Sequence, residues 1–115
     1  MDLFLQSFLI LICFHFLMDY PLQGEFISKF KSRHVYRGEK NPFWIHCLTA
    51  HSAIHSLPYL LLFGNVGAAL VMFVSHWIID LLKCENFTNI HIDQCLHLII
   101  IFVLCIVYDF QLPWM

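Results

Sequence analysis

Charged residues are scarce in this chain, where Asp, Glu, Lys and Arg make up only 12% of 115 residues. A soluble domain carries about 25%. Six Lys and Arg against eight Asp and Glu also give no basic surface of the kind that binds nucleic acid. Hydrophobic residues instead account for 60% of the chain and aromatic residues for 17%. We therefore expect a small integral membrane protein, a single domain over residues 1–115, with no nucleic-acid partner.

Paired cysteines and a signal peptide are also missing from the pattern. The five cysteines show no CxxC spacing and mostly lie in apolar segments, so we interpret them as small buried hydrophobes. The N-terminal segment has Asp2 but no basic residue before its apolar run, and no small-x-small cleavage site follows. Neither a disulfide framework nor a cleaved leader is expected.

Four apolar segments follow one another along the chain, at about residues 3–20, 43–63, 66–84 and 92–108. Each approaches the roughly 20 residues that a helix needs to cross a hydrocarbon layer of about 30 Å. The segments are continuously apolar and do not alternate, which argues against strands. The sequence therefore predicts an all-α fold, a four-helix transmembrane bundle.

The connections between these segments carry their own signals. Asn41 and Pro42 fit the N-cap and the first position of the second helix. Gly64-Asn65 predicts a tight turn, so the second and third helices should pack as an antiparallel hairpin. Residues 24–38 have apolar side chains on one helical face and basic side chains largely elsewhere, which predicts an amphipathic helix in the headgroup region. A basic loop without helix is the alternative.

All six basic residues fall on one side of the membrane in this topology. Five lie between the first and second segments, and Lys83 closes the third. By the positive-inside rule this side is cytoplasmic, and both termini lie outside.

Each apolar segment carries one pair of His or Asp residues four positions apart. The pairs are His15 and Asp19, His51 and His55, His76 and Asp80, and Asp93 and His97. A step of four places two side chains on one helical face, as in helices that supply two ligands to one metal centre. Three pairs lie in the cytoplasmic half, and the second segment's pair reaches the same depth if its first turn stands above the hydrocarbon. We predict one layer of eight metal ligands.

The energy of insertion favours this interpretation. A charged side chain inside a span costs roughly 2.5–3.5 kcal/mol, whereas a structural zinc contributes about 10–16 kcal/mol in small peptides. Five His and three Asp suit one or two divalent ions, Zn²⁺ first and Fe²⁺ or Mn²⁺ less exclusively. Three Asp against two divalent ions leave one positive charge, which suits an anionic substrate. Hydrogen bonds between the helices are the alternative role for these pairs.

Other residues stand near these pairs. Lys83, three positions beyond Asp80, either binds a phosphate or oxyanion or complements the C-terminus of its helix. Gln23, four positions after Asp19, and Gln94, beside Asp93, are expected to support the ligands. Asp93 or Asp80 is the candidate general base.

The ordered motifs resemble those of a family. They run His15-x3-Asp19-x2-Leu22-Gln23, Lys29, His51-x3-His55, His76-x3-Asp80-x2-Lys83 and Asp93-Gln94-x2-His97. This order is similar to that of a small integral-membrane family of bacteria and phages whose function is unknown, and also to membrane-bound metal-dependent hydrolases. The resemblance covers about residues 11–100. It implies a four-span metal protein in the bacterial inner membrane, in which Lys29 supports the ligands.

Several functions fit these features. The leading hypothesis is a metal-dependent hydrolase at the cytoplasmic leaflet that acts on a lipid-like or amphipathic phosphoester or amide, with Asp93, Asp80 and Lys83 in the chemistry. A divalent-metal transporter or metal-binding module is the first alternative, and a di-iron or haem oxidoreductase is another. A structural partner of a host membrane complex is the last. Membrane lipid or a lipid-linked substrate is the expected partner, and a homo-oligomer is compatible with the sequence.

Overall fold

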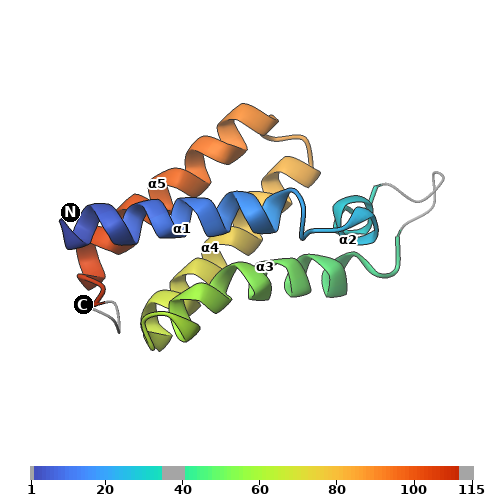
Figure 1. The fold of residues 1–115 in the computed structure, drawn as a ribbon. Helices are drawn as coiled ribbons and strands as arrows, with labels where there is room; N and C mark the ends of the chain where they lie inside the picture. Colours follow the sequence, from blue (N-terminus) through green and yellow to red (C-terminus); the bar gives the residue numbers. More distant parts are fainter. Residues whose placement is uncertain (1, 35–40, 112–115) are drawn as a thin grey trace.

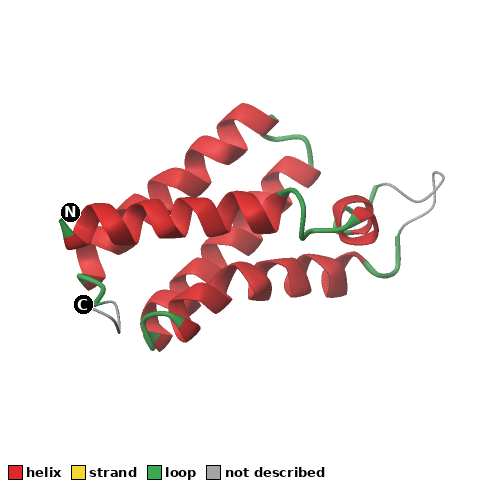
Figure 2. Cartoon of the chain, viewed as in Figure 1, coloured by secondary structure: helices red, strands yellow, loops and turns green. Residues whose placement is uncertain are grey.

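The computed structural model describes residues 2–34 and 41–111. Its elements are α1 (Leu3–Asp19), α2 (Glu25–Phe30), α3 (Trp44–Leu61), α4 (Val66–Cys84) and α5 (Ile90–Tyr108). Across the described residues all regular structure is helical and no strand is present, as Figure 2 shows. The prediction of an all-α fold is confirmed.

The four long helices form a bundle in which each contacts two neighbours. Helix α3 packs against α4, α4 against α5, α5 against α1, and α1 against α3. The start of α1, the end of α5 and the α3–α4 turn lie at one end of the bundle, while α2 and the α4–α5 loop lie at the other (Figure 1). The short helix α2 packs against α3. We call the end that carries α2 the α2 end.

The α3–α4 turn is built as the sequence predicts. Gly64 takes a φ of 60°, which a glycine adopts without the steric cost of a side chain. Its backbone N–H bonds to the Leu60 carbonyl, and the Asn65 N–H bonds to that of Tyr59. The Asn65 side chain then accepts a hydrogen bond from the Ala68 N–H and caps α4. The turn closes the antiparallel hairpin of α3 and α4.

The start of α3 differs from the prediction. The helix begins at Trp44, two residues later than an Asn41 cap would place it, and Phe43 is its N-cap residue. Asn41 is 1% exposed, and its side-chain amide donates to the carbonyls of Phe30 and Ser32 at 2.7 and 3.1 Å. The amide therefore satisfies backbone acceptors at the end of α2, which a sequence pattern for helix starts does not reveal.

The amphipathic helix is shorter than predicted. It covers Glu25–Phe30 instead of residues 24–38, and residues 35–38 lie outside the described residues. The helix ends at Phe30, and the next residue, Lys31, is buried in the bundle. The Asn41 amide holds the carbonyls of Phe30 and Ser32 at this end.

Two helices are long and apolar enough to span a membrane, Val66–Cys84 and Ile90–Tyr108, judged by length and composition. Helix α1 is apolar but has 17 residues, and α3 does not meet the same criterion. The structure therefore gives two candidate spans where the sequence predicts four. In the 18-residue apolar stretch of each helix, only 33% of α4 and 28% of α5 is buried inside the bundle.

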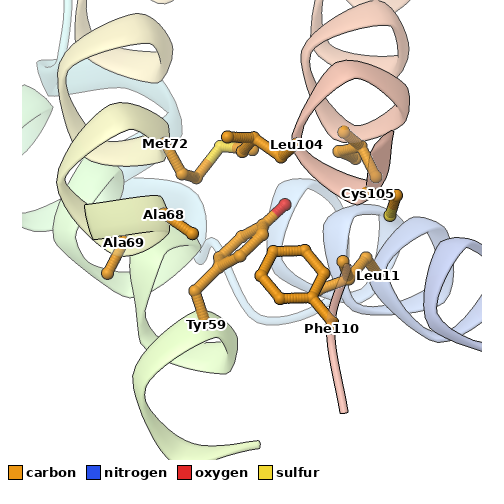
Figure 3. Packing of buried hydrophobic residues seen from close by; sticks show 9 residues of the cluster. Leu11, Tyr59, Ala68, Ala69, Met72, Leu104, Cys105 and Phe110 are labelled. Carbon is orange, nitrogen blue, oxygen red and sulfur yellow. The ribbon is translucent and has the colours of Figure 1, made fainter. Parts of the chain in front are cut away.

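The apolar core occupies the half of the bundle away from α2. Figure 3 shows Tyr59 and Phe110 side by side, with Met72 and Leu104 facing each other across the bundle. The rings of Tyr59 and Phe110 have centroids 5.7 Å apart. Leu11 from α1 completes this layer. Close packing here fills the bundle on one side of the polar residues described next.

Candidate metal centre

Eight buried His and Asp side chains converge in the bundle, and they are the eight predicted from the sequence. Each long helix contributes its pair, because a four-residue step puts both side chains on the inward face. Every one of them is at most 6% exposed. They are His15, Asp19, His51, His55, His76, Asp80, Asp93 and His97.

Asp19 is the acceptor at the α1 side of the cluster. Its Oδ1 lies 3.0 Å from His51 Nε2 and 3.1 Å from His55 Nε2. Its Oδ2 accepts a hydrogen bond from the Gln94 amide at 2.9 Å and lies 3.5 Å from His15 Nε2. One carboxylate of α1 thus faces imidazoles from α1 and α3 and an amide from α5.

Asp80 has the same role on the α4 side. Its Oδ2 accepts a hydrogen bond from Lys31 Nζ at 2.9 Å and lies 3.3 Å from His51 Nε2. Its Oδ1 is 3.2 Å from His97 Nε2. The His51 nitrogen is therefore within 3.3 Å of two carboxylates.

Asp93 is the least engaged of the three carboxylates. Its Oδ2 receives hydrogen bonds from Lys83 Nζ at 3.3 Å and from Gln94 Nε2 at 3.1 Å. Its Oδ1 lies 3.4 Å from His97 Nε2 but has no hydrogen bond to any residue that the structure describes, although Asp93 is completely buried.

His76 stands out because neither ring nitrogen has a hydrogen-bond partner among the described residues. The side chain is 0% exposed, and its ring stacks between those of His55 and His97, with centroids 3.8 and 4.2 Å away. An unsatisfied buried polar group costs about 1–3 kcal/mol, and native proteins keep few of them. A bound cation would satisfy such nitrogens.

Donor atoms from seven of the eight residues gather in three groups, within each of which all atoms lie within 4.8 Å of one another. The groups are Asp19, His51, His55 and His76; His76, Asp80 and His97; and Asp19, Asp93 and His97. His15 is in none of them, and its Nε2 is 2.9 Å from Gln94 Oε1. Imidazole and carboxylate donors in sets of three or four are the ligands of catalytic zinc sites.

The predicted supporting residues differ in whether they contact the side chains of the ligands or the backbone. Gln94 contacts His15, Asp19 and Asp93, so its amide links α1 and α5 within the cluster. Lys83 reaches Asp93. Gln23 donates to the backbone carbonyl of Asp19 at 2.8 Å and does not contact the carboxylate.

Lys29 lies outside the cluster. Its side chain is 57% exposed and pairs with Glu25 one helical turn earlier at 2.8 Å. Among the residues that the structure describes, Lys29 thus has a surface contact within α2 and contacts none of the eight ligands.

Lys31 is the residue that sequence reasoning missed. It is 5% exposed, and its ammonium bonds to Asp80 and, at 2.6 Å, to Gln23 Oε1. In the sequence it is one of several basic residues in a predicted surface helix, and nothing in the local pattern separates it from Lys29 or Arg33. Its partners Asp80 and Gln23 lie on other parts of the chain, so the burial of Lys31 depends on long-range contacts.

Arg33 and His34, which follow Lys31 in the sequence, form ion pairs with Glu85. Arg33 donates to the two carboxylate oxygens of Glu85 at 2.6 and 3.0 Å, and His34 Nε2 lies 2.7 Å from one of them. The hydrogen bonds from Arg33, with that from His34, hold the pKa of Glu85 at about 2. Glu85 in turn raises the pKa of Arg33. These contacts tie the segment after α2 to the end of α4.

A cavity of about 300 Å³ with polar and apolar side chains in its wall borders the cluster at the α2 end. Both lysines, Lys31 and Lys83, line it together with Asp19, Gln23 and Gln94. The cluster is therefore closed by apolar packing on one side and bordered by this cavity on the other.

Fold and site together define an all-helical protein with apolar helices and a buried His/Asp cluster at one end of its bundle. A family model described as "Protein of unknown function (DUF3307)" matches residues 7–113. Since the match covers nearly the whole chain, the chain belongs to this family. No curated protein and no solved structure matches it.

Proposed function

We propose that this chain is a membrane-embedded metal-dependent hydrolase with one or two divalent ions, Zn²⁺ first, in the His/Asp cluster. The observation that carries the proposal is the convergence of eight buried ligand-type side chains, among which His76 has no hydrogen-bond partner in the described part of the chain. Lys31 and Lys83 pair with two of the three buried carboxylates, and burying the third carboxylate with five imidazoles is costly without a further cation.

The donor set fits such an ion. Imidazole nitrogens and carboxylate oxygens are ligands of Zn²⁺, Fe²⁺ and Mn²⁺, while the absence of thiolates from the three donor groups argues against a structural cysteine site. A divalent ion held by these residues would lower the pKa of a bound water to about 7 and polarise the bond to be cleaved.

The chain's own residues then have distinct roles in hydrolysis. Asp93 has one oxygen without a hydrogen bond from the described residues, whereas Asp80 is held by Lys31 and two imidazoles. Asp93 is therefore the better placed general base. Asp93 takes a proton from water as the water oxygen bonds to the phosphorus or carbonyl carbon. The bond from that atom to the leaving oxygen or nitrogen then breaks, and Asp93 passes its proton to the leaving group. Lys83, beside Asp93, is placed to stabilise the developing anion.

The surface supports a location in the membrane. Large apolar side chains of α4 and α5 are exposed, among them Leu70 at 60%, Val74 at 53%, Ile99 at 55% and Ile106 at 58%. Apolar surface on this scale marks an interaction site or a lipid-facing surface. With four spans, the basic residues of the α2 end face the cytoplasm of a bacterial host, both termini lie outside, and the cluster lies near the cytoplasmic leaflet.

Transport through the bundle is less well supported than hydrolysis. A carrier site is expected near the midplane with access from both sides, whereas the packed layer of Leu11, Tyr59, Met72 and Leu104 closes the side opposite the cavity. The site geometry suits a substrate that enters and leaves at the α2 end.

Turnover assays on the purified protein test the proposal. The full chain, purified with its metal, is assayed against lipid phosphates, isoprenoid phosphates and lipid amides. We expect metal-dependent turnover that His51→Ala abolishes and His46→Ala retains, because His46 is exposed and lies outside the cluster. Absence of metal-dependent, His51-dependent turnover across the panel would contradict the proposal. Transport would instead appear as metal flux into proteoliposomes.

A further inference from the structure

The cavity at the α2 end has a chemistry of its own. It is lined by two ammonium groups, Lys31 and Lys83, and by the amides of Gln23 and Gln94. All four side chains can donate hydrogen bonds. The Asp19 carboxylate also lines the cavity and is the member of the cluster that borders it. A volume of about 300 Å³ is at the lower end of small-molecule sites.

The two lysines hold the carboxylates from the cavity side. Lys31 Nζ is 2.9 Å from Asp80, and Lys83 Nζ is 3.3 Å from Asp93 and 4.0 Å from Asp80. Both side chains are largely buried, with 6% and 23% exposure. A buried ammonium is costly unless it is paired, so these lysines need an anion whenever the carboxylates are neutralised by something else.

Metal binding would do this. With neutral imidazoles, three carboxylates and two ammonium groups leave one negative charge in the site. One divalent ion turns this into one positive charge, and two ions give three. An uncharged amide or carboxylic ester leaves that surplus buried and unpaired, whereas a phosphate group carries the opposite charge and several strong acceptor oxygens.

From this charge surplus and the paired lysines at the entrance, we infer that the substrate's reacting group is a phosphate ester held by Lys31 and Lys83. The inference rests on the proposed metal site and selects the phosphoester over the amide. The rim of the cavity carries Tyr20 and Ile90, which are 57% and 46% exposed, so the rest of the molecule meets an apolar surface. An amphipathic phosphate ester is the substrate class that fits both parts.

Binding of inorganic phosphate to the zinc-loaded full chain in detergent tests the inference. Zinc content is measured in every sample by elemental analysis, and phosphate affinity by titration calorimetry. We expect Lys83→Met to weaken phosphate binding at least about tenfold, the loss of one charge-assisted hydrogen bond, and Lys83→Arg to retain part of it. Lys29→Met is the matched control, because that lysine is exposed and outside the cavity, and it should bind phosphate like the unaltered chain.

Lys31→Met is a second test variant, and it should also weaken phosphate binding. Because it leaves Asp80 without its ammonium partner, the titration uses only folded protein whose zinc content has been confirmed. Zinc-loaded protein that does not bind phosphate, or an equal loss in Lys29→Met and Lys83→Met, would overturn the inference and leave the metal site standing. Failure of the unaltered chain to bind zinc would overturn both, since the positive surplus then never arises.

Discussion

Replacing His76 by leucine should make the metal-free protein more stable and at the same time remove its response to zinc. His76 is fully buried, and neither of its ring nitrogens has a hydrogen-bond partner among the described residues. Leucine has a similar volume and no polar atoms, so it fills the space without the desolvation cost.

The size of the effect follows from that cost. An unsatisfied buried polar group lowers stability by about 1–3 kcal/mol. Removing it restores this stability, and the lost ring stacking with His55 and His97 offsets part of the gain. A gain of about 1–2 kcal/mol in the free energy of unfolding is therefore expected without metal. Zinc at 100 times its dissociation constant should raise the free energy of unfolding of the unaltered chain by about 2.7 kcal/mol. His76→Leu should lose this response, because His76 belongs to two of the three donor groups.

Thermal unfolding in detergent, followed by circular dichroism with zinc and with a chelator, measures both effects. His46→Leu is the control, since it makes the same change at an exposed histidine and should keep the full zinc response. Destabilisation of the metal-free His76→Leu protein together with an intact zinc response would refute the reasoning, because His76 would then be an ordinary packing residue.

Three further changes probe other parts of the structure. Asp80→Asn leaves the Lys31 ammonium buried without its carboxylate. We therefore expect thermal unfolding to show a free energy of unfolding lower by about 3–5 kcal/mol, and elemental analysis to show loss of bound zinc. Unchanged stability and zinc content would contradict this. Leu104→Ala in the apolar layer should cost about 2–5 kcal/mol with zinc content unchanged, and a loss of zinc would show that the two halves are not independent. The pKa of Glu85 is lowered to about 2 by Arg33 and His34. Its ion pairs therefore stabilise the fold fully above the usual Glu value near 4.5, and this stability is lost as the pH falls toward 2. The stability difference between the unaltered chain and Glu85→Gln should shrink over this range, and a difference that persists at the lowest pH would contradict the assignment.

Much of the fold follows from hydropathy, because long apolar segments between polar turns leave few alternatives to helices. The four long helices differ from the predicted segments by at most two residues at either end. The i and i+4 spacing likewise brings each His or Asp pair to one face of its helix, and the antiparallel order of the helices brings the four faces to one level.

Long-range contacts of polar loop residues could not be predicted in the same way. Lys31 and Asn41 are buried because of partners on other elements, namely Asp80 on α4 and the carbonyls at the end of α2. A basic residue in an amphipathic segment and an asparagine before proline have more common local roles, and those local roles were the ones the pattern favoured. Gln23 likewise meets the backbone of Asp19, a contact that depends on the turn after α1.

The metal content of the protein purified from membranes tests the central claim most directly. Elemental analysis of the full chain, isolated without chelators beside the Asp80→Asn and His46→Leu variants, should find one or two divalent ions per chain in the unaltered protein and in His46→Leu, with zinc the foremost. The same measurement should find the metal lost from Asp80→Asn. Metal at background level in the unaltered chain, even after zinc is added back, would contradict the account and leave the His/Asp cluster as a set of hydrogen bonds between helices.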